Sequence, residues 1–218
     1  MAAAASVGMD AAARGGGASG NMSVAMALRR AFQETDSLVC AADAGAGSTA
    51  VTAVICRSTL WVASVGDSRA VLCRGGAAVA LTEDHKPERE DEAARVQAAG
   101  GRILFNRGAR VGGVLAMTRA LGDHHLRCSG VVAEPDVSVT ARDRVHDEFL
   151  LLASDGLWDV MSNQEAVNLA SRCLERAAAR GAKRSAACRV ASTVLSRAAL
   201  ERGSRDNVTV AVVDLVGR

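Results

Sequence analysis

The stretch AVTAVICRSTLWVASVGDSRAVLCR, residues 50–74, contains three apolar runs separated by short polar turns. The runs are AVTAVIC (50–56), LWVASV (60–65) and RAVLCR (69–74). Runs of this length that are rich in Val and bounded by polar turns predict β-strands. Such short connections can join antiparallel neighbours, whereas a parallel pair needs a crossover of a dozen residues or more. The stretch therefore predicts an antiparallel meander.

Helices and further strands are predicted on both sides of this stretch. Residues 86–101 have Pro87 at the expected first helical position, acidic residues in the first turn and Gly100-Gly101 as a stop. Apolar spacing and apolar runs predict helices over 22–40, 163–180 and 185–202, and strands over 148–154 and 207–215. Strands joined by short turns, with helices grouped between them, indicate the α+β class rather than a doubly wound parallel sheet.

Length, composition and net charge indicate the number of domains and exclude some classes of partner. The 218 residues suit one domain, and the Ala- and Gly-rich residues 1–20 are predicted to be a disordered leader before a domain over 21–218. A formal net charge of +2 argues against nucleic acid or an anionic membrane as the main partner. No apolar run approaches the ~20 residues of a membrane helix. Six cysteines without C-x-x-C spacing indicate reduced thiols, and we expect the nucleus and/or the cytoplasm.

Four aspartates lie at the ends of apolar runs. Asp155 follows FLLLAS, Asp206 precedes NVTVAVVDL, Asp123 follows the LAMTRAL run, and Asp159 comes one helical turn after Asp155. Mg²⁺ and Mn²⁺ prefer carboxylate oxygens, so acids converging at strand ends could form a site for such ions. Asp-Gly is also a common turn, and an Asp before a strand often caps a loop. The residues alone leave both interpretations open.

Seven stretches in a fixed order resemble the type 2C protein phosphatases, the family of metal-dependent Ser/Thr phosphatases. They extend over roughly four-fifths of the chain, from Gly47 to Leu215. They are GSTA (47–50), VASVGDSRAVL (62–72), LTEDHKPEREDEAARVQAAGG (81–101), RVGGVLAMTRALGD (110–123), EPDV (134–137), DEFLLLASDGLWDV (147–160) and GSRDNVTVAVV (203–213). The resemblance, with that of the flap described below, points to a plant protein.

The resemblance implies a β-sandwich of two antiparallel sheets flanked by helices, with a metal site at one end. It implies that Asp155 and Asp206 are ligands of a binuclear Mg²⁺ or Mn²⁺ centre. It also implies that Asp123 and Asp159 support a third, weaker ion. Asp67, in the VGDSR turn, is interpreted as structural. The implied function is hydrolysis of phosphoserine and phosphothreonine by metal-activated water, with phosphorylated proteins such as protein kinases as substrates.

One part of the family pattern is missing from this sequence. Residues 1–46 contain no D-G-H-G-G motif, whose Asp, Gly and His supply a bridging ligand, a carbonyl ligand and a proposed general acid in the family. We therefore expect a phosphatase-like domain that is incomplete at its N-terminus, and we assign no catalytic residue. The chain could be a truncated gene model or splice product, which we favour, or a reduced site with weak activity. The third possibility is a catalytically impaired interaction protein that binds kinases or receptors.

The segment GGRILFNRGARVGGVLAMTRALGD (100–123) resembles the flap of the plant phosphatases that repress abscisic acid signalling. In most of that group, a Trp in the flap enters the pocket of the hormone receptor. Alignment on GARV places Asn106 or a neighbour at that position. We therefore predict a possible hormone-receptor contact around Asn106, with weak inhibition by the receptor, because Asn cannot supply a buried aromatic anchor.

Overall fold

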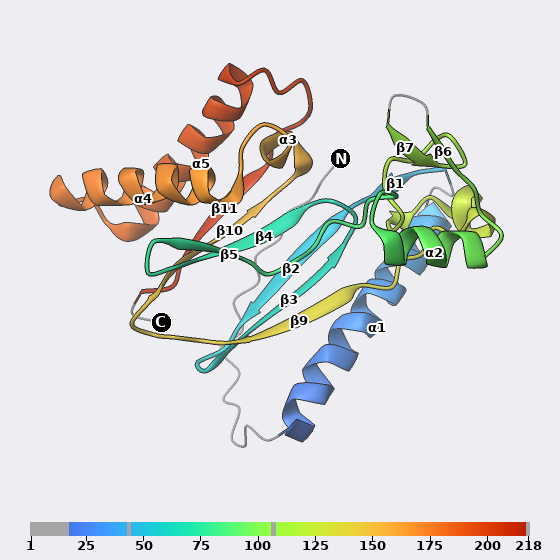
Figure 1. Ribbon diagram of the computed structural model, residues 1–218. Coiled ribbons are helices and arrows are strands. Elements are labelled where there is room, and N and C mark those ends of the chain that lie inside the picture. Colours follow the sequence, from blue (N-terminus) through green and yellow to red (C-terminus); the bar gives the residue numbers. More distant parts are fainter. Residues whose placement is uncertain (1–17, 43–44, 106–107, 217–218) are drawn as a thin grey trace.

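The computed structural model describes residues 18–42, 45–105 and 108–216 and consists of two packed antiparallel sheets with helices outside them (Figure 1). One sheet has the strand order β11–β10–β4–β5 and the other the order β2–β3–β9. The strands of the first are β4 (Arg69–Arg74), β5 (Ala77–Ala80), β10 (Asp147–Ala153) and β11 (Val210–Asp214). Those of the second are β2 (Ala50–Ile55), β3 (Thr59–Val65) and β9 (Asp136–Ala141). The predicted α+β sandwich of two antiparallel sheets is confirmed.

Strand β10 is buried on both faces, which explains its unbroken apolar sequence. Leu150 and Leu152 contact the other sheet through residues such as Val51 and Val62. Phe149, Leu151 and Ala153 face the helices α4 and α5. These helices span Asn163–Ala179 and Arg184–Glu201. Burying a side chain of the size of Leu stabilises a fold by about 1.5–3 kcal/mol, so β10 is the centre of the core.

The predicted meander is wrong at its second turn. β2 and β3 form a hairpin, but β3 and β4 belong to different sheets, and the turn at 66–68 carries the chain from one sheet to the other. β3 already pairs with β2 and β9, and β4 already pairs with β10 and β5, so neither has a free edge for the other. Gly66 makes the sharp turn with φ +89°, a conformation that favours glycine.

Helix α1 (Ala18–Ala42) covers the outer face of the β2–β3–β9 sheet. Phe32 packs there against Ala63, Val65 and Leu121. The helix predicted over 22–40 is confirmed, but it begins earlier. Of the predicted leader, 1–17 lies outside the described residues, and 18–20 belongs to α1. No helix in the described part of the chain is both long and apolar enough to cross a membrane.

Smaller elements lie at one end of the sandwich (Figure 1). Helix α2 begins at Glu90 rather than at the predicted Pro87, because 86–89 forms a turn in which Arg89 N–H donates to Lys86 O (3.1 Å). The four-residue helix α3, the 3-10 helix η1 and two short ribbons, β1 with β8 and β6 with β7, complete the fold. Their bounds are α2 (Glu90–Ala98), α3 (Asp155–Trp158), η1 (His124–Ser129), β1 (Gly47–Ser48), β8 (Leu121–Gly122), β6 (Ile103–Phe105) and β7 (Ala109–Val111).

Candidate metal centre

Asp155 lies where the central strand β10 leaves the core. β10 ends at Ala153, Ser154 is the N-cap residue, and Asp155 is the first residue of α3. Asp159 ends the same helical turn, with its N–H donating to Asp155 O (2.8 Å). The short α3 is fixed by Trp158, which is buried and whose Nε1 donates to Ala153 O (2.9 Å). The two acids are therefore attached to the most buried part of the fold.

Hydrogen bonds bring the segment of Asp206 to the same strand end. Ser154 Oγ donates to Asn207 O (3.0 Å), and Thr209 N–H donates to Ser154 Oγ (3.1 Å). A Cβ at Gly156 would come within 2.5 Å of Asn207 O, so glycine is required for this approach. These bonds replace regular pairing, so β11 begins at Val210, later than the predicted 207. Asp155 and Asp206, far apart in the sequence, become neighbours.

Asp67 belongs to this group of acids. It lies in the inter-sheet turn and is only 3% exposed. Burial, and then the nearby charge of Asp155, raise its pKa to about 6. Burial, and then Asp206 and Asp159, also raise the pKa of Asp155. Four carboxylates thus interact electrostatically where β10, the 66–68 turn and the 204–207 segment meet.

Lys86 is the cation nearest to these acids. Its Nζ lies 3.5 Å from Asp67 Oδ2 and 3.6 Å from Asp159 Oδ1. Burial lowers the pKa of Lys86, but Asp67 and Asp159 outweigh it, and the pKa is raised above its ordinary value. One ammonium group therefore partly balances several carboxylates. Sequence reasoning assigned no role to Lys86.

Arg69, at the start of β4, is a second cation near the cluster. Its guanidinium donates to both oxygens of Asp84 (2.9 and 2.8 Å) and to Asn163 Oδ1 (2.7 Å), and it lies over the Trp158 ring, 5.3 Å from the ring centroid. A bidentate pair of this kind fixes the side chain in one orientation. Arg69 therefore connects the first turn of α4 to the end of β10, and it contacts α3 through the ring of Trp158.

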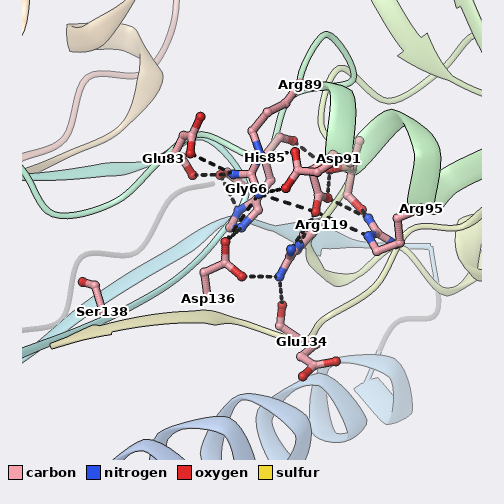
Figure 2. A network of polar contacts seen from close by, with 12 residues as sticks. Gly66, Glu83, His85, Arg89, Asp91, Arg95, Arg119, Glu134, Asp136 and Ser138 are labelled. Atoms are coloured by element: carbon pink, nitrogen blue, oxygen red, sulfur yellow. Dashed lines mark hydrogen bonds and ion pairs between the residues drawn. The ribbon is translucent and has the colours of Figure 1, made fainter.

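A buried polar network holds the loop that carries Lys86 (Figure 2). The ring nitrogens of His85, which is fully buried, lie 3.0 Å from Gly66 O and 3.1 Å from Asp136 Oδ2, and its backbone N–H donates to Gly66 O (3.0 Å). The His85 hydrogen bond, together with the Arg119 charge, holds the pKa of Asp136 well below its usual range. The contacts between His85 and Gly66 fasten the Lys86 loop to the turn that contains Asp67.

Glu92 of α2 is the second centre of this polar network. Its carboxylate accepts from Arg119 Nη2 (2.6 Å), from Arg95 Nη2 (2.7 Å) and from Thr118 Oγ1, and it is 1% exposed. Arg119 also donates to Asp136 Oδ1 (2.8 Å). α2, the 118–119 segment and β9 are therefore joined by charge-assisted hydrogen bonds. These bonds fix the positions of the elements that surround the Lys86 loop.

Asp123, the remaining predicted ligand, has a different environment. It follows β8 in the left-handed conformation (φ 51°), and its N–H donates to Ala46 O (2.8 Å). Its carboxylate fills the space beside Gly47 that a Cβ there would occupy. The interactions described above connect Asp155 with Asp159 and Asp206 but not with Asp123. Its predicted part in a metal site stays a prediction.

The donor set fits a hard divalent cation. Asp155, Asp159, Asp206 and Asp67 offer carboxylate oxygens, which Mg²⁺ and Mn²⁺ prefer. Burial, and then the charge of neighbouring carboxylates, raise the pKa values of Asp67 and Asp155. The oxygens of Asp155, Asp159 and Asp206 do not all lie within 4.8 Å of one another. Mutual repulsion of like charges explains such spacing. Acids at this spacing could close around a cation.

Sequence reasoning missed Asp67 and Lys86 as members of the cluster. Asp67 was assigned to a hairpin turn, and its closeness to Asp155 depends on the crossing between sheets. One signal was available in VGDSRAVL, where an acid lies between two runs too apolar for surface strands. Trp61, 2% exposed, and Trp158, 6% exposed, are core residues. Asn106, the predicted receptor contact, lies outside the described residues.

Known proteins share both the sequence and the fold. The family model Protein phosphatase 2C matches residues 12–208. The chain is 50% identical over 202 residues to "Probable protein phosphatase 2C 68" of Oryza sativa subsp. japonica, covering 86% of this chain and 54% of that protein. It is 46% identical over 208 residues to "Protein phosphatase 2C 77" of Arabidopsis thaliana, covering 88% and 49%. The chain thus spans about half the length of these relatives.

Solved structures agree with the sequence matches. A serine-threonine phosphatase 2C from Toxoplasma gondii superposes with a TM-score of 0.74 at 26% identity, covering 88% of this chain and 67% of that one. A C. elegans sex determining protein superposes with a TM-score of 0.75 at 30% identity, covering 86% and 46%. The sandwich and its helices are therefore an arrangement that these proteins share.

Proposed function

The chain belongs to the protein phosphatase 2C family, and from this we propose that it hydrolyses phosphoserine and phosphothreonine in proteins with the help of Mg²⁺ or Mn²⁺. Asp155 and Asp206 would hold the ions, and Asp159 and Asp123 would support them. When bound, such an ion activates a water molecule and neutralises the charge of a phosphoryl group. The substrates would be phosphorylated proteins such as protein kinases.

The observation that carries the proposal is the surplus of negative charge at the end of β10, where buried Asp67 and half-buried Asp155 lie near the exposed Asp159 and Asp206. Carboxylates that are desolvated beside one another are unfavourable for the apoprotein, and their raised pKa values express that cost. Functional sites commonly retain such groups because a ligand compensates them. In this chain, the Lys86 ammonium would partly offset the charge of Asp67 and Asp159, and Ser154 would hold the Asp206 segment against α3.

The test is dephosphorylation of a phosphothreonine peptide by the full chain over a Mn²⁺ titration. We expect turnover that requires Mn²⁺ and is abolished by Asp155→Asn, which keeps the shape of the side chain but removes its charge. Glu201→Gln, at the exposed end of α5, is the matched control and should leave turnover unchanged. Circular dichroism of each variant would establish that the fold is retained.

A second candidate function has its own supporting observation. The sequence contains no D-G-H-G-G segment, which in the family supplies further metal ligands. If folded protein shows no turnover at millimolar Mn²⁺, the phosphatase proposal fails for this chain. The alternative, a phosphatase-like protein that binds kinases or receptors without hydrolysing them, would then be favoured. Turnover that survives Asp155→Asn would instead overturn the assignment of the metal centre.

We also propose that the β6–β7 ribbon is a docking surface for a hormone receptor. Supporting this, Leu104, Phe105 and Val114 are exposed apolar residues on or beside the ribbon, and Phe105 is 84% exposed. Because alignment on GARV puts Asn106 or a neighbour, and no Trp, at the receptor-contacting position, we expect hormone-loaded abscisic acid receptor to inhibit weakly. The measurement is receptor titration of the phosphatase assay with Asn106→Trp as the comparison. Near-stoichiometric inhibition of the unsubstituted chain would contradict this expectation.

A further inference from the structure

A second cluster of ligand side chains lies away from the Asp155 centre, where α1 ends beside η1. Asp36 and Cys40 are four residues apart on α1, so they share one face of the helix. His124 is the first residue of η1. One ligand atom from each residue, a carboxylate oxygen, a thiol sulfur and a ring nitrogen, lies within 4.8 Å of the other two. Among the described residues, no other three such side chains lie this close together.

The carboxylate of Asp36 is oriented by its neighbours. Gly122 N–H donates to Oδ1 (2.7 Å), and Arg127 Nη2 donates to the same oxygen (2.5 Å). The other oxygen, Oδ2, faces His124 Nε2 at 3.5 Å. One oxygen is therefore fixed by hydrogen bonds, and the other faces the imidazole. Carboxylates that bind metals are commonly held in this way by hydrogen bonds around the site.

The chemistry of the three donors differs from that of the Asp155 centre. A thiolate, an imidazole nitrogen and one carboxylate oxygen form a set that suits Zn²⁺, whereas Mg²⁺ takes oxygen donors. Zn²⁺ is commonly tetrahedral, so three protein ligands leave one position for water. The side chain of Asp36 is 16% exposed and that of His124 is 44% exposed, so an ion can enter from solvent.

We propose that Asp36, Cys40 and His124 form a zinc-binding site that joins α1 to the segment after β8. This site is independent of the proposed phosphatase activity. Binding would fasten the end of α1 to the residue that follows Asp123. Burial, and then the Asp36 carboxylate, raise the pKa of the Cys40 thiol, so binding of Zn²⁺ would also release a proton.

The test uses the full chain in millimolar Mg²⁺, which occupies carboxylate sites, together with added Co²⁺ and Zn²⁺. Cobalt bound to a thiolate gives a near-ultraviolet charge-transfer band, which reports sulfur ligation directly. We expect one equivalent of Co²⁺ to produce this band and one equivalent of Zn²⁺ to abolish it. Zn²⁺ should also raise the melting temperature. Cys40→Ser should remove the band, and His124→Ala should weaken binding at least tenfold.

Two controls separate this site from general metal binding. His125→Ala changes the exposed neighbour of His124, and Cys128→Ser changes an exposed thiol outside the cluster. Both should bind Co²⁺ as the unsubstituted chain does. The proposal is overturned if no charge-transfer band forms, or if the band persists in Cys40→Ser. It also fails if His124→Ala binds with unchanged affinity, since the cluster would then lack its imidazole ligand. Circular dichroism would confirm that the variants fold.

Discussion

Glu92→Gln tests the buried hydrogen-bond network that joins α2 to the 118–119 segment. The substitution keeps the shape of the side chain but removes a charge that is 1% exposed and is bound by two guanidinium groups. Burial alone would raise the pKa of Glu92. The hydrogen bonds from Arg119, Arg95 and Thr118 outweigh it and hold the pKa well below its usual range. The ionised carboxylate is therefore strongly favoured in the folded state.

The size of the effect follows from what the partners retain. Breaking a buried ion pair by removing one partner costs about 3–5 kcal/mol. Arg119 keeps its bonds to Asp136 and Glu134, and Arg95 keeps those to Gly130 and Thr118. Because neither guanidinium is left without acceptors, we expect the lower end, about 3 kcal/mol. For a chain of this length, that loss corresponds to a melting temperature lower by about 6–12 °C.

Urea unfolding followed by fluorescence of the two tryptophans measures the free energy of unfolding. The depressed pKa means that the contribution is complete above the unfolded-state value of about 4.3 and is lost as the pH falls through the folded-state value. The difference between Glu92→Gln and the unsubstituted chain should thus be full at pH 7 and smaller below about pH 4. Glu34→Gln removes the exposed pair with Arg30 and should leave stability unchanged within error. A loss below about 1 kcal/mol at pH 7 would refute the reasoning.

Two further predictions concern residues around the acidic cluster. In EDTA, Asp67→Asn should raise the free energy of unfolding at pH 8 by up to about 3 kcal/mol and not at pH 4, as measured by urea unfolding. A folded-state pKa of about 6 means that stability is lost as the pH rises from about 4 to about 6; equal gains at both pH values would contradict this. Trp158→Ala should lower the free energy of unfolding by about 3–5 kcal/mol, because a buried ring that also lies under Arg69 is removed. A loss below about 1 kcal/mol would show that α3 does not depend on this ring.

The strands β2, β3, β4, β10 and β11 could be predicted from sequence because each contains a continuous apolar run, whereas the more exposed β5 and β9 do not and were not predicted. β4 has the bounds predicted for it, 69–74, since both of its faces are covered and its apolar run ends where burial ends. The full set of pairing partners of β3, and that of β4, could not be predicted in the same way. Each strand pairs on one side with a sequence neighbour, β2 or β5, but the partners on the other side, β9 and β10, come from distant parts of the chain.

The candidate site was predictable to a similar extent. Asp155, Asp159 and Asp206 were predicted because motifs mark them, and in the structure the charges of Asp206 and Asp159 influence Asp155; their role as metal ligands stays a prediction. Asp67 and Lys86 join them through the crossing between sheets and through the His85 contacts, which are properties of tertiary structure. The start of α2 was misplaced because Pro87 suits a first helical turn. The local turn that ends at Arg89 took precedence.

The pairing of β4 with β10 also means that β4 is synthesised well before its partner strand. Arg74 and its partner Asp147 are 73 residues apart, so β4 leaves the ribosome well before the strand that completes its edge. At about 5–20 residues per second, the delay is roughly 4–15 s. During that interval, β4, an apolar strand that lies in the middle of the folded sheet, has one unpaired edge. An unpaired edge of this kind favours aggregation. We therefore expect nascent chains to depend on chaperones until residue 153 has been made.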